Sequence, residues 1–581
     1  MRLQVVKSKN AASLYVVKST YDNGKRSSKV VEQLGTYDSL LKKLRGEDPI
    51  KWGKERAAEL TRQEKEQTRE IVVKCSPAKI IAKGVRRSFN GGYLFLSKIY
   101  HELGLSKLCK EVSGKYKFTY DLDSILSRLV YGRLLFPASK LATVKLSEKL
   151  IEQPNFEIQH IYRALEVIAK ETDSLQAQLY QNSLKISKRK TGLLYYDCTN
   201  YFFEIEQEDG MQQYGYSKDH KPNPIVQMGL FIDGDGIPLA FDMFDGNMNE
   251  QPTLKPLEER IISDFGLSKF VVCTDAGLSS TANRRFNTKG GRAFITTQSI
   301  KKLKKHLKEW VLESTGWRLS DSPKSYDISK LYDEKYLDRF TGNIDAVKDR
   351  IFFKERWIKE DGLEQRLIVT YSIKYRDYQR KIREGQVKRA IRLISTNPKK
   401  WKKANQNDFK RFIESKSYTA DGKAAKKEIL SIDSALIAKE EIFDGFYGSC
   451  TNLEDDPEVI AKVNHRRWEI EECFRIMKSE FKARPVNLSR DDRIKAHFMT
   501  CFITLLIYRL LEKRLGEEFT SRQIIGGLRD MDFFEIEGEG YSPAYTRTDF
   551  TDALHDAFGF RTDYEIVTNK QMKNIFKLTK K

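Results

Sequence analysis

The stretch that organises this sequence is Asn464–Lys478, which reads NHRRWEIEECFRIMK. It lies in a run from Glu458 to Arg484 that contains no Gly or Pro and consists mostly of good helix formers, so we predict a helix. At about 100° per residue this helix has one apolar face and a neighbouring charged stripe. The apolar face comprises Val463, Ile470, Phe474, Met477 and Phe481, and the stripe comprises Arg467, Glu471 and Lys478, with Asn464 near its edge.

The stripe places Glu471 at the border of the buried face, between two cations. A solvated surface helix can carry Glu and Lys at the same spacing. The order of residues nevertheless resembles the signature of DDE transposases of the bacterial insertion-sequence-four superfamily, Tyr-x2-Arg-x3-Glu-x6-Lys. Arg467, Glu471 and Lys478 match it, and Asn464 stands where the signature has Tyr. The resemblance implies an RNase H-like core that cuts and joins DNA with divalent metal ions.

Two aspartates lie at the places where such a core needs carboxylates. Asp197 falls within residues 192–204, which are rich in strand-forming residues, although an edge-strand or turn Asp is the alternative. Asp275 ends the apolar run Phe270–Thr274, where α/β sheets form their sites, although it could instead cap the helix that follows. The chain between them is long enough for two strands and a helix.

The segments around these aspartates predict the order of a sheet. Val226–Asp233 and Ile237–Phe244 are strand-like runs joined by Gly234-Asp235-Gly236, so they complete an antiparallel three-stranded opening. Thr253–Ile262 is expected to be a helix, and Ala293–Thr297 the last core strand.

Composition indicates a folded protein with a polyanionic partner. The 581 residues are 40% hydrophobic and 32% charged, with a net charge of +22 spread along the chain. The seven cysteines form no C-x-x-C pair, which argues against a zinc ribbon or disulfide framework. The most apolar run, Phe502–Leu511, is too short to span a bilayer. We therefore expect no membrane partner and a cytoplasmic location, and the resemblance implies a bacterial cytoplasm with association to the nucleoid.

The predicted fold class is multidomain α/β, with an RNase H-like catalytic core interrupted by a β-containing insertion, an N-terminal β unit and a helical DNA-binding region. A basic turn, Lys25–Lys29, follows the hairpin signal Asp22-Asn23-Gly24. The expected domains are residues 1–75, a β unit plus charged helical connector; 76–190, a mainly helical DNA-end-binding region; 191–300, the first half of the core; 301–455, an insertion with basic and strand segments; 456–530, the second half of the core; and 531–581, a C-terminal extension.

Two short loops and one helical piece add to the resemblance. Residues 215–220 include Lys218 and His220, which could approach DNA near the site, and residues 244–250 form a second loop; both could simply be polar loops. The piece Pro137–Ala142, PASKLA, resembles a segment that precedes the first catalytic strand in this group. A plain helical support domain is the alternative to DNA-end binding by residues 76–190.

The resemblance assigns roles to the candidate residues. Asp197, Asp275 and Glu471 would be the catalytic carboxylates and would hold two Mg²⁺ ions, with Mn²⁺ as a substitute. Arg467 and Lys478 would hold phosphates, with Asn464, Lys218 and His220 as further DNA contacts. Partners would be double-stranded DNA, both terminal inverted repeats and target, and a second copy of the chain in the DNA complex. The alternatives are a catalytically inactive, host-adopted DNA-binding protein and a structure-specific nuclease without strand transfer.

Overall fold

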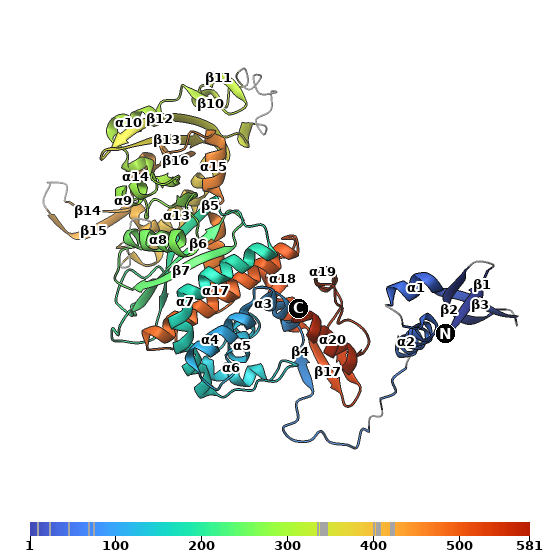
Figure 1. The fold of residues 1–581 in the computed structure, drawn as a ribbon. Helices are drawn as coiled ribbons and strands as arrows, with labels where there is room; N and C mark the ends of the chain where they lie inside the picture. Colours follow the sequence, from blue (N-terminus) through green and yellow to red (C-terminus); the bar gives the residue numbers. More distant parts are fainter. Residues whose placement is uncertain are drawn as a thin grey trace. The chain divides into compact units, whose positions relative to one another are not determined.

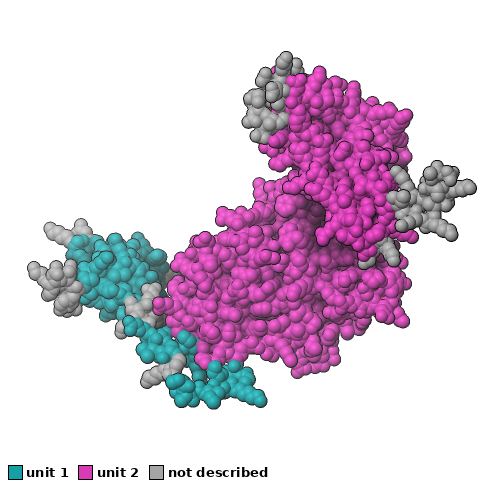
Figure 2. Space-filling model, turned by 180° about the vertical axis from the view of Figure 1, so that it is seen from behind, with its two compact units in different colours: residues 1–85, 536–539 teal, residues 86–535, 540–581 magenta. Residues whose placement is uncertain are grey.

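The computed structural model describes residues 1–8, 11–22, 25–44, 47–67, 70–73, 76–333, 336, 347–398, 401–402, 408–418 and 424–581. The chain forms two compact units, one of residues 1–85 with 536–539 and one of residues 86–535 with 540–581 (Figure 2).

The first unit is a three-stranded antiparallel sheet with two helices. Its strands β1 (Arg2–Lys7), β2 (Ala12–Asp22) and β3 (Lys25–Thr36) pair in the order β1-β2-β3, as the strand pattern predicted. The helices are α1 (Tyr37–Lys43) and α2 (Pro49–Gln67). The prediction of a basic turn at residues 25–29 was wrong, because these residues already pair with β2 as the start of β3. Asn23 and Gly24 lie outside the described residues.

The second unit is built on a ten-stranded sheet with the order β11-β10-β12-β13-β16-β9-β8-β5-β6-β7. Its five strands around the aspartates are β5 (Leu193–Phe202), β6 (Ile225–Asp233), β7 (Pro238–Asp245), β8 (Val271–Thr274) and β9 (Ala293–Gln298). β6 is antiparallel to both β5 and β7, whereas β5, β8 and β9 are mutually parallel neighbours. All five strands predicted from the sequence are confirmed.

The sheet does not end at β9, where the sequence analysis placed the last core strand. β16 (Phe446–Thr451) pairs antiparallel with β9, and β13 (Leu363–Tyr371) and β12 (Phe352–Glu360) continue the sheet. β10 (Trp317–Leu319) and β11 (Ser322–Tyr326) form its far edge (Figure 1). The segment predicted as an insertion thus adds its strands to the sheet that carries the aspartates. Its other described elements are α10 (Lys305–Leu312), α13 (Ile373–Thr396), the hairpin β14 (Ile413–Tyr418) and β15 (Ala424–Ile432), and α14 (Ser434–Glu441).

Helices cover both faces of the sheet at β5. Tyr195 and Tyr201 pack into the core that contains α17 (Asp491–Arg514), while Tyr196 and Cys198 pack into the core that contains α8 (Leu254–Asp264). Because β5 is buried on both faces, most of its residues are apolar, and the polar exceptions are Asp197, Thr199 and Asn200. Figure 1 shows α17 in orange lying along α7 (Ile158–Ile186).

The helix α17 packs against strand β7 of the sheet. It is long and apolar enough to cross a membrane by length and composition, but 94% of its apolar window is buried inside the protein. The remaining elements of this unit are β4 (Ser88–Asn90), α3 (Tyr93–Glu102), α4 (Leu105–Tyr116), α5 (Leu122–Leu135), α6 (Lys140–Ser147), α9 (Thr281–Phe286), α15 (Pro457–His465), α16 (Trp468–Ser479), α18 (Ser521–Asp530), β17 (Asp532–Ile536), β18 (Gly540–Pro543), α19 (Asp549–Phe558), β19 (Val567–Thr568) and α20 (Asn569–Thr579).

A fully buried ion pair closes the turn between β6 and β7. Asp233 pairs with Arg189, and both side chains are 0% exposed. Its other oxygen accepts hydrogen bonds from the backbone N–H groups of Asp235 and Ile237, each at 3.0 Å. The carboxylate therefore holds both the turn and the cation that follows α7.

We expect Asp233→Ala to destabilise the protein by about 3–5 kcal/mol, because it leaves the buried Arg189 charge without a partner. The free energy of unfolding, measured by denaturant titration, tests this. Lys190→Met is the matched control, because it removes a neighbouring exposed pair with Asp235. A loss below about 1 kcal/mol for Asp233→Ala would show that the pair does not hold the turn.

Candidate active site

Asp197 and Asp275 meet at the carboxyl ends of two neighbouring parallel strands. β5 and β8 pair in register from Leu193 with Val271 to Tyr195 with Cys273. Continuing this register by two residues places Asp197 beside Asp275, just beyond the last residue of β8. The geometry is the one in which α/β sheets form their sites.

The neighbourhood of Asp197 opposes its ionisation. Burial raises the pKa of Asp197 to about 7, and the nearby charge of Asp275 adds to this rise, while Lys218 and Arg467 oppose it. One carboxylate oxygen accepts a 2.8 Å hydrogen bond from the Cys198 N–H. The two aspartates are therefore close enough to repel each other, and the site favours a cation between or beside them.

Asp275 does not cap the helix that follows it. Its Oδ1 accepts a 3.0 Å hydrogen bond from the Leu278 N–H, which closes a turn directly after β8. The helix α9 is capped instead by Ser280, whose side chain accepts from the Asn283 N–H. The helix-cap alternative from the sequence is therefore wrong, and the second carboxylate oxygen of Asp275 is not used by this turn.

Arg467 lies between the aspartates and Glu471. Its Nη2 is 3.9 Å from Glu471 Oε1, and its side chain is 18% exposed against 61% for Glu471. The charges of Asp275 and Asp197 help to raise the pKa of Arg467 against the effect of burial. The structure thus brings two carboxylates together, whereas Glu471 is linked to them only through the guanidinium of Arg467, and the ligand atoms of the three do not all lie within 4.8 Å of one another.

Two lysines line the same site. Lys478 Nζ donates a 2.6 Å hydrogen bond to Thr199 Oγ1 and lies over the Tyr201 ring. Burial, with repulsion from Lys218, lowers the pKa of Lys478 to about 8. Lys218 Nζ donates to the Cys198 carbonyl at 2.6 Å and pairs with Glu250 at 2.7 Å. Lys478 is therefore a cation held by a hydroxyl, and Lys218 a cation already neutralised by a carboxylate.

The charged helix is interrupted where the sequence predicted continuity. α15 ends at His465 and α16 begins at Trp468, so Arg466 and Arg467 form the junction. Backbone hydrogen bonds across this junction span three residues, as from Arg467 N to Asn464 O at 3.3 Å. The tight turn follows from tertiary contacts, since Asn464 is anchored to the sheet while Glu469 pairs with Arg466 and Arg509.

Asn464 does not occupy the position predicted for a DNA contact. Its side chain is 2% exposed, and its amide donates to the hydroxyls of Tyr447 at 3.3 Å and Thr297 at 3.5 Å. It joins α15 to β16 and β9, so its role in this structure is to position the junction that carries Arg467. His220 is exposed, with φ at 55°, and none of the contacts found among the described residues links its ring to the aspartates.

The comparison with protein families decides the class of this site. Residues 201–507, more than half of the chain, match the family of the transposase DDE domain. This chain is a DDE transposase. The matched range contains Asp275 and Glu471 and begins just after Asp197. Members of this family generally use divalent metal ions, and the paired carboxylates suit such ions.

No curated protein matches the chain. Among solved structures, the cryo-EM structure of the piggyBac transposase synaptic complex with hairpin DNA matches at 8% sequence identity, with 84% of each chain covered and a TM-score of 0.35.

Sequence reasoning missed three residues of the transposase site. Tyr447, on β16, places its hydroxyl 2.8 Å from Thr297 Oγ1 and beside Arg467. Glu250 pairs with Lys218, and Thr199 holds Lys478. Thr199 had a signal, because it lies two residues after Asp197 and so on the same face of the strand. The sequence holds no such signal for Tyr447, because this residue comes close to Thr297 and Arg467 only when β16 pairs with β9.

A second cluster of possible metal ligands lies away from this site. In the part of the chain that the structure describes, Asp552, His555 and Asp563 form the one group of three such side chains whose ligand atoms lie within 4.8 Å of one another. Arg561 pairs with both aspartates, at 2.8 Å and 2.7 Å. Since a guanidinium already balances the charge there, we do not assign a metal to it.

The raised pKa of Asp197 predicts how stability depends on pH. Between the pKa of an unfolded Asp and about 7, the folded state holds a proton that the unfolded state has released, so stability falls as pH rises. Without divalent cations, the wild-type free energy of unfolding should fall by about 2–3 kcal/mol more than that of Asp197→Asn between roughly pH 5 and pH 7.

Denaturant titration of both proteins across this pH range provides the measurement. Asp264→Asn, which removes an exposed carboxylate at the end of α8, should keep the wild-type slope. Parallel slopes for wild type and Asp197→Asn would mean that Asp197 ionises as freely as a surface aspartate.

Proposed function

We propose that the chain is a bacterial transposase of the insertion-sequence-four superfamily that cleaves DNA at element ends and transfers the freed 3′ ends into target DNA. The observation that carries this proposal is the convergence of Asp197, Asp275 and the Arg467–Glu471 pair at one edge of the sheet. The strand order β7-β6-β5-β8-β9, with β6 antiparallel and β5, β8 and β9 parallel, supports an RNase H-like core.

The residues at this edge fit divalent cations. Asp197, whose pKa burial raises to about 7, lies beside Asp275, so the two carboxylates form an oxygen-rich site. Asp197, Asp275 and Glu471 would hold Mg²⁺, with Mn²⁺ as a substitute, since both prefer oxygen ligands. Bound there, two such ions would lower the pKa of an attacking hydroxyl and stabilise the leaving oxygen.

The protein's own residues would position the DNA for two successive reactions. In the first, water attacks a phosphodiester at the element end, the P–O3′ bond breaks, and a 3′-hydroxyl and a 5′-phosphate result. In the second, that 3′-hydroxyl attacks another phosphodiester, so one P–O bond forms as one breaks. Lys478 and Arg467 would hold the phosphates, Lys478 as a point charge and Arg467 through its planar fork.

The partners follow from charge and chemistry. The net charge of +22 favours a long polyanion, and we propose double-stranded DNA, both terminal inverted repeats and target. Joining two ends requires that both be held together, so we propose a homodimer in the DNA complex. The proposed location is the bacterial cytoplasm, on the nucleoid.

Two adjacent glutamates on α16, Glu471 and Glu472, provide a test variant and its control. Glu471→Gln should abolish cleavage and joining, by a factor above about 10³, while leaving DNA binding within about threefold, because the amide cannot replace a charged ligand. Glu472→Gln is the control, because its carboxylate lies on another face of α16 and pairs with Arg475. The assay offers labelled element ends and a plasmid target in Mg²⁺.

The products of this assay separate the functions. Integrated products support the transposase, whereas cleavage without joining would identify a nuclease, and metal-independent binding without either would identify an inactive DNA-binding protein. Joining by Glu471→Gln at the wild-type rate would remove Glu471 from the site.

Lys478 allows a test of the phosphate contact. Lys478→Met should reduce the slope of log Kd against log salt by about 0.9, because one fewer phosphate is neutralised. Lys462→Met is the control, because it removes the same charge from α15, where the lysine pairs with Glu458 at 2.6 Å. Fluorescence anisotropy with labelled duplex at several salt concentrations gives both slopes, and equal slopes for wild type and Lys478→Met would contradict the contact.

A further inference from the structure

A basic cavity lies beyond the C-terminal end of α16, the helix that carries Glu471. It has a volume of about 250 Å³ and is enclosed by the end of α5, the start of α6 and the segment that follows α16. Its lining includes five side chains that can carry positive charge, namely Arg133, Lys140, Lys482, Arg484 and His497. No carboxylate is among the residues that line it.

Two of these cations are buried without a carboxylate partner. Lys140 and Arg133 are each 6% exposed, and neither forms an ion pair with any Asp or Glu in the described part of the chain. Lys140 Nζ donates to His497 Nδ1 at 3.4 Å, and His497 Nε2 faces the Ala483 carbonyl at 3.2 Å. Arg133 donates to backbone carbonyls, but its Nε has no hydrogen-bond partner.

Such an arrangement is costly unless an anion joins it. Burying an unpaired charge costs several kcal/mol, which is why buried cations are normally paired. Burial lowers the pKa of Lys140 to about 7, and the charge of Arg133 contributes to this. It also lowers the pKa of His497 well below its usual range, and Lys140 and Arg133 add to the effect. An anion in the cavity would oppose both pKa shifts, because it would stabilise the charged forms of Lys140 and His497.

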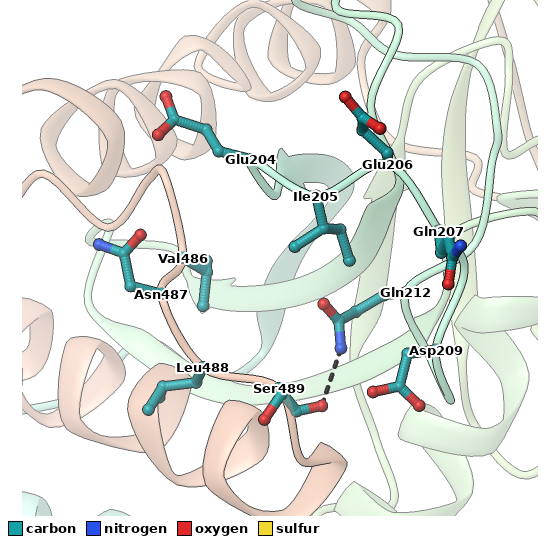
Figure 3. A pocket seen from close by; sticks show the side chains of 10 residues that line it. All are labelled: Glu204, Ile205, Glu206, Gln207, Asp209, Gln212, Val486, Asn487, Leu488 and Ser489. Atoms are coloured by element: carbon teal, nitrogen blue, oxygen red, sulfur yellow. Dashed lines mark hydrogen bonds between the residues drawn. The ribbon is translucent and has the colours of Figure 1, made fainter.

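A neighbouring cavity shows the opposite chemistry. It has a volume of about 680 Å³, shares Val486, Asn487 and Leu488 with the basic cavity, and is lined by Glu204, Glu206 and Asp209 (Figure 3). In Figure 3 the side chain of Ile205 points into it, and Gln212 reaches across to the Ser489 carbonyl. Its carboxylates would repel a phosphate, so the segment 486–488 separates an acidic cavity from a basic one.

We propose that the basic cavity is a seat for one phosphodiester of the DNA backbone, outside the catalytic site. This rests on the proposed function, because it takes the bound polyanion to be DNA. Lys140 and Arg133 supply buried charge, and Lys482 supplies a charge at the rim. The cavity also lies at the N-terminus of α6, where Ser139 caps the helix.

Two arginines that line the basic cavity also contact segments next to the candidate active site. Arg133 Nη1 donates to the Phe481 carbonyl at 3.2 Å, so it grips the chain directly after α16, the helix that carries Glu471. Arg484 forms an ion pair with Asp219, the neighbour of Lys218. A strand running from the aspartates along α16 would therefore reach the cavity, and a phosphate seated there would hold the end of the glutamate helix.

Lys140→Met tests the seat with catalysis switched off. Both the variant and its parent carry Glu471→Gln, and binding of a labelled duplex is measured by anisotropy at several salt concentrations. We expect affinity to fall roughly tenfold and the salt slope to fall by about 0.9. Lys145→Met is the control, because it removes a charge from the exposed side of the same helix, and its effect should be markedly smaller.

A second variant, Lys482→Asn, tests the proposal at an exposed position where misfolding is not expected. Lys482 is exposed at φ 48°, a conformation that Asn tolerates, so Lys482→Asn removes the rim charge without disturbing the core. It should reduce the salt slope as well. The proposal would be overturned if the salt slope of DNA binding were unchanged in both Lys482→Asn and folded Lys140→Met. It would also be overturned if Lys140→Met and Lys145→Met lost the same amount of DNA affinity.

A third experiment distinguishes binding of the DNA backbone from binding of free phosphate. Inorganic phosphate, against chloride at equal ionic strength, should raise the melting temperature of the wild type more than that of Lys140→Met. If phosphate does so while the slopes for DNA stay unchanged, the cavity takes free phosphate and the assignment to DNA is wrong. If the parent binds no duplex at all, the proposed function itself fails.

Discussion

The central constraint on this protein is the repulsion between two carboxylates at the ends of adjacent parallel strands. The register of β5 with β8 leads Asp197 and Asp275 to the same level, and the burial of Asp197 limits the water that would screen its charge. Among the arginines of α16 and its junction with α15, Arg467 is the one whose pKa both aspartates raise and whose guanidinium also lies near Glu471. Much of the surrounding structure serves to hold this cation in place.

The position of Arg467 depends on anchors on either side of the helix junction. On one side, the buried amide of Asn464 bonds to Tyr447 and Thr297, which fixes α15 to the sheet. On the other side, Glu469 pairs with Arg466 and Arg509, and Arg509 Nε donates to the Gly236 carbonyl at 3.0 Å. Gly236 has φ at +75°, and a Cβ there would meet Glu469 Oε2, so this turn can approach the helix closely only as glycine.

Much of this arrangement could be predicted from local sequence, and the rest depends on contacts that local sequence does not encode. Residues 192–204 and 270–275 indicated strands because buried strands are apolar and rich in β-branched and aromatic residues. The apolar face with Ile470 and Met477 predicted which side of the helix is buried, and both are 0% exposed. The break at Arg466 was missed because no Gly or Pro marks it. Apart from the local Arg466–Glu469 pair, the contacts at the break come from residues outside the helix pattern, namely Tyr447, Thr297 and Arg509.

The same limit applies to the extension of the sheet and to the basic cavity. β16 follows β9 by about a domain's length of chain, so their pairing, and with it the place of Tyr447, reflects long-range topology. Lys140 looked like one of several charges on a helical segment, and only folding encloses it with Arg133 and His497. Helical periodicity shows which face of a helix is apolar, but not which distant segment will cover it.

The placement of charge along α16 indicates how metal and DNA sites depend on each other. The helix begins at the cation that separates the carboxylates and ends where Arg133 grips the Phe481 carbonyl. Lys478 lies between these ends, held by a hydroxyl with its pKa lowered to about 8, so it gains from an added anion. Carboxylates thus gather near the start of the helix with Arg467 among them, whereas no carboxylate lines the cavity beyond its end. Under the proposed function, a cation at the first end and a phosphate at the second would both act on this one helix, so we expect each to favour the same position of Glu471 and to strengthen binding of the other.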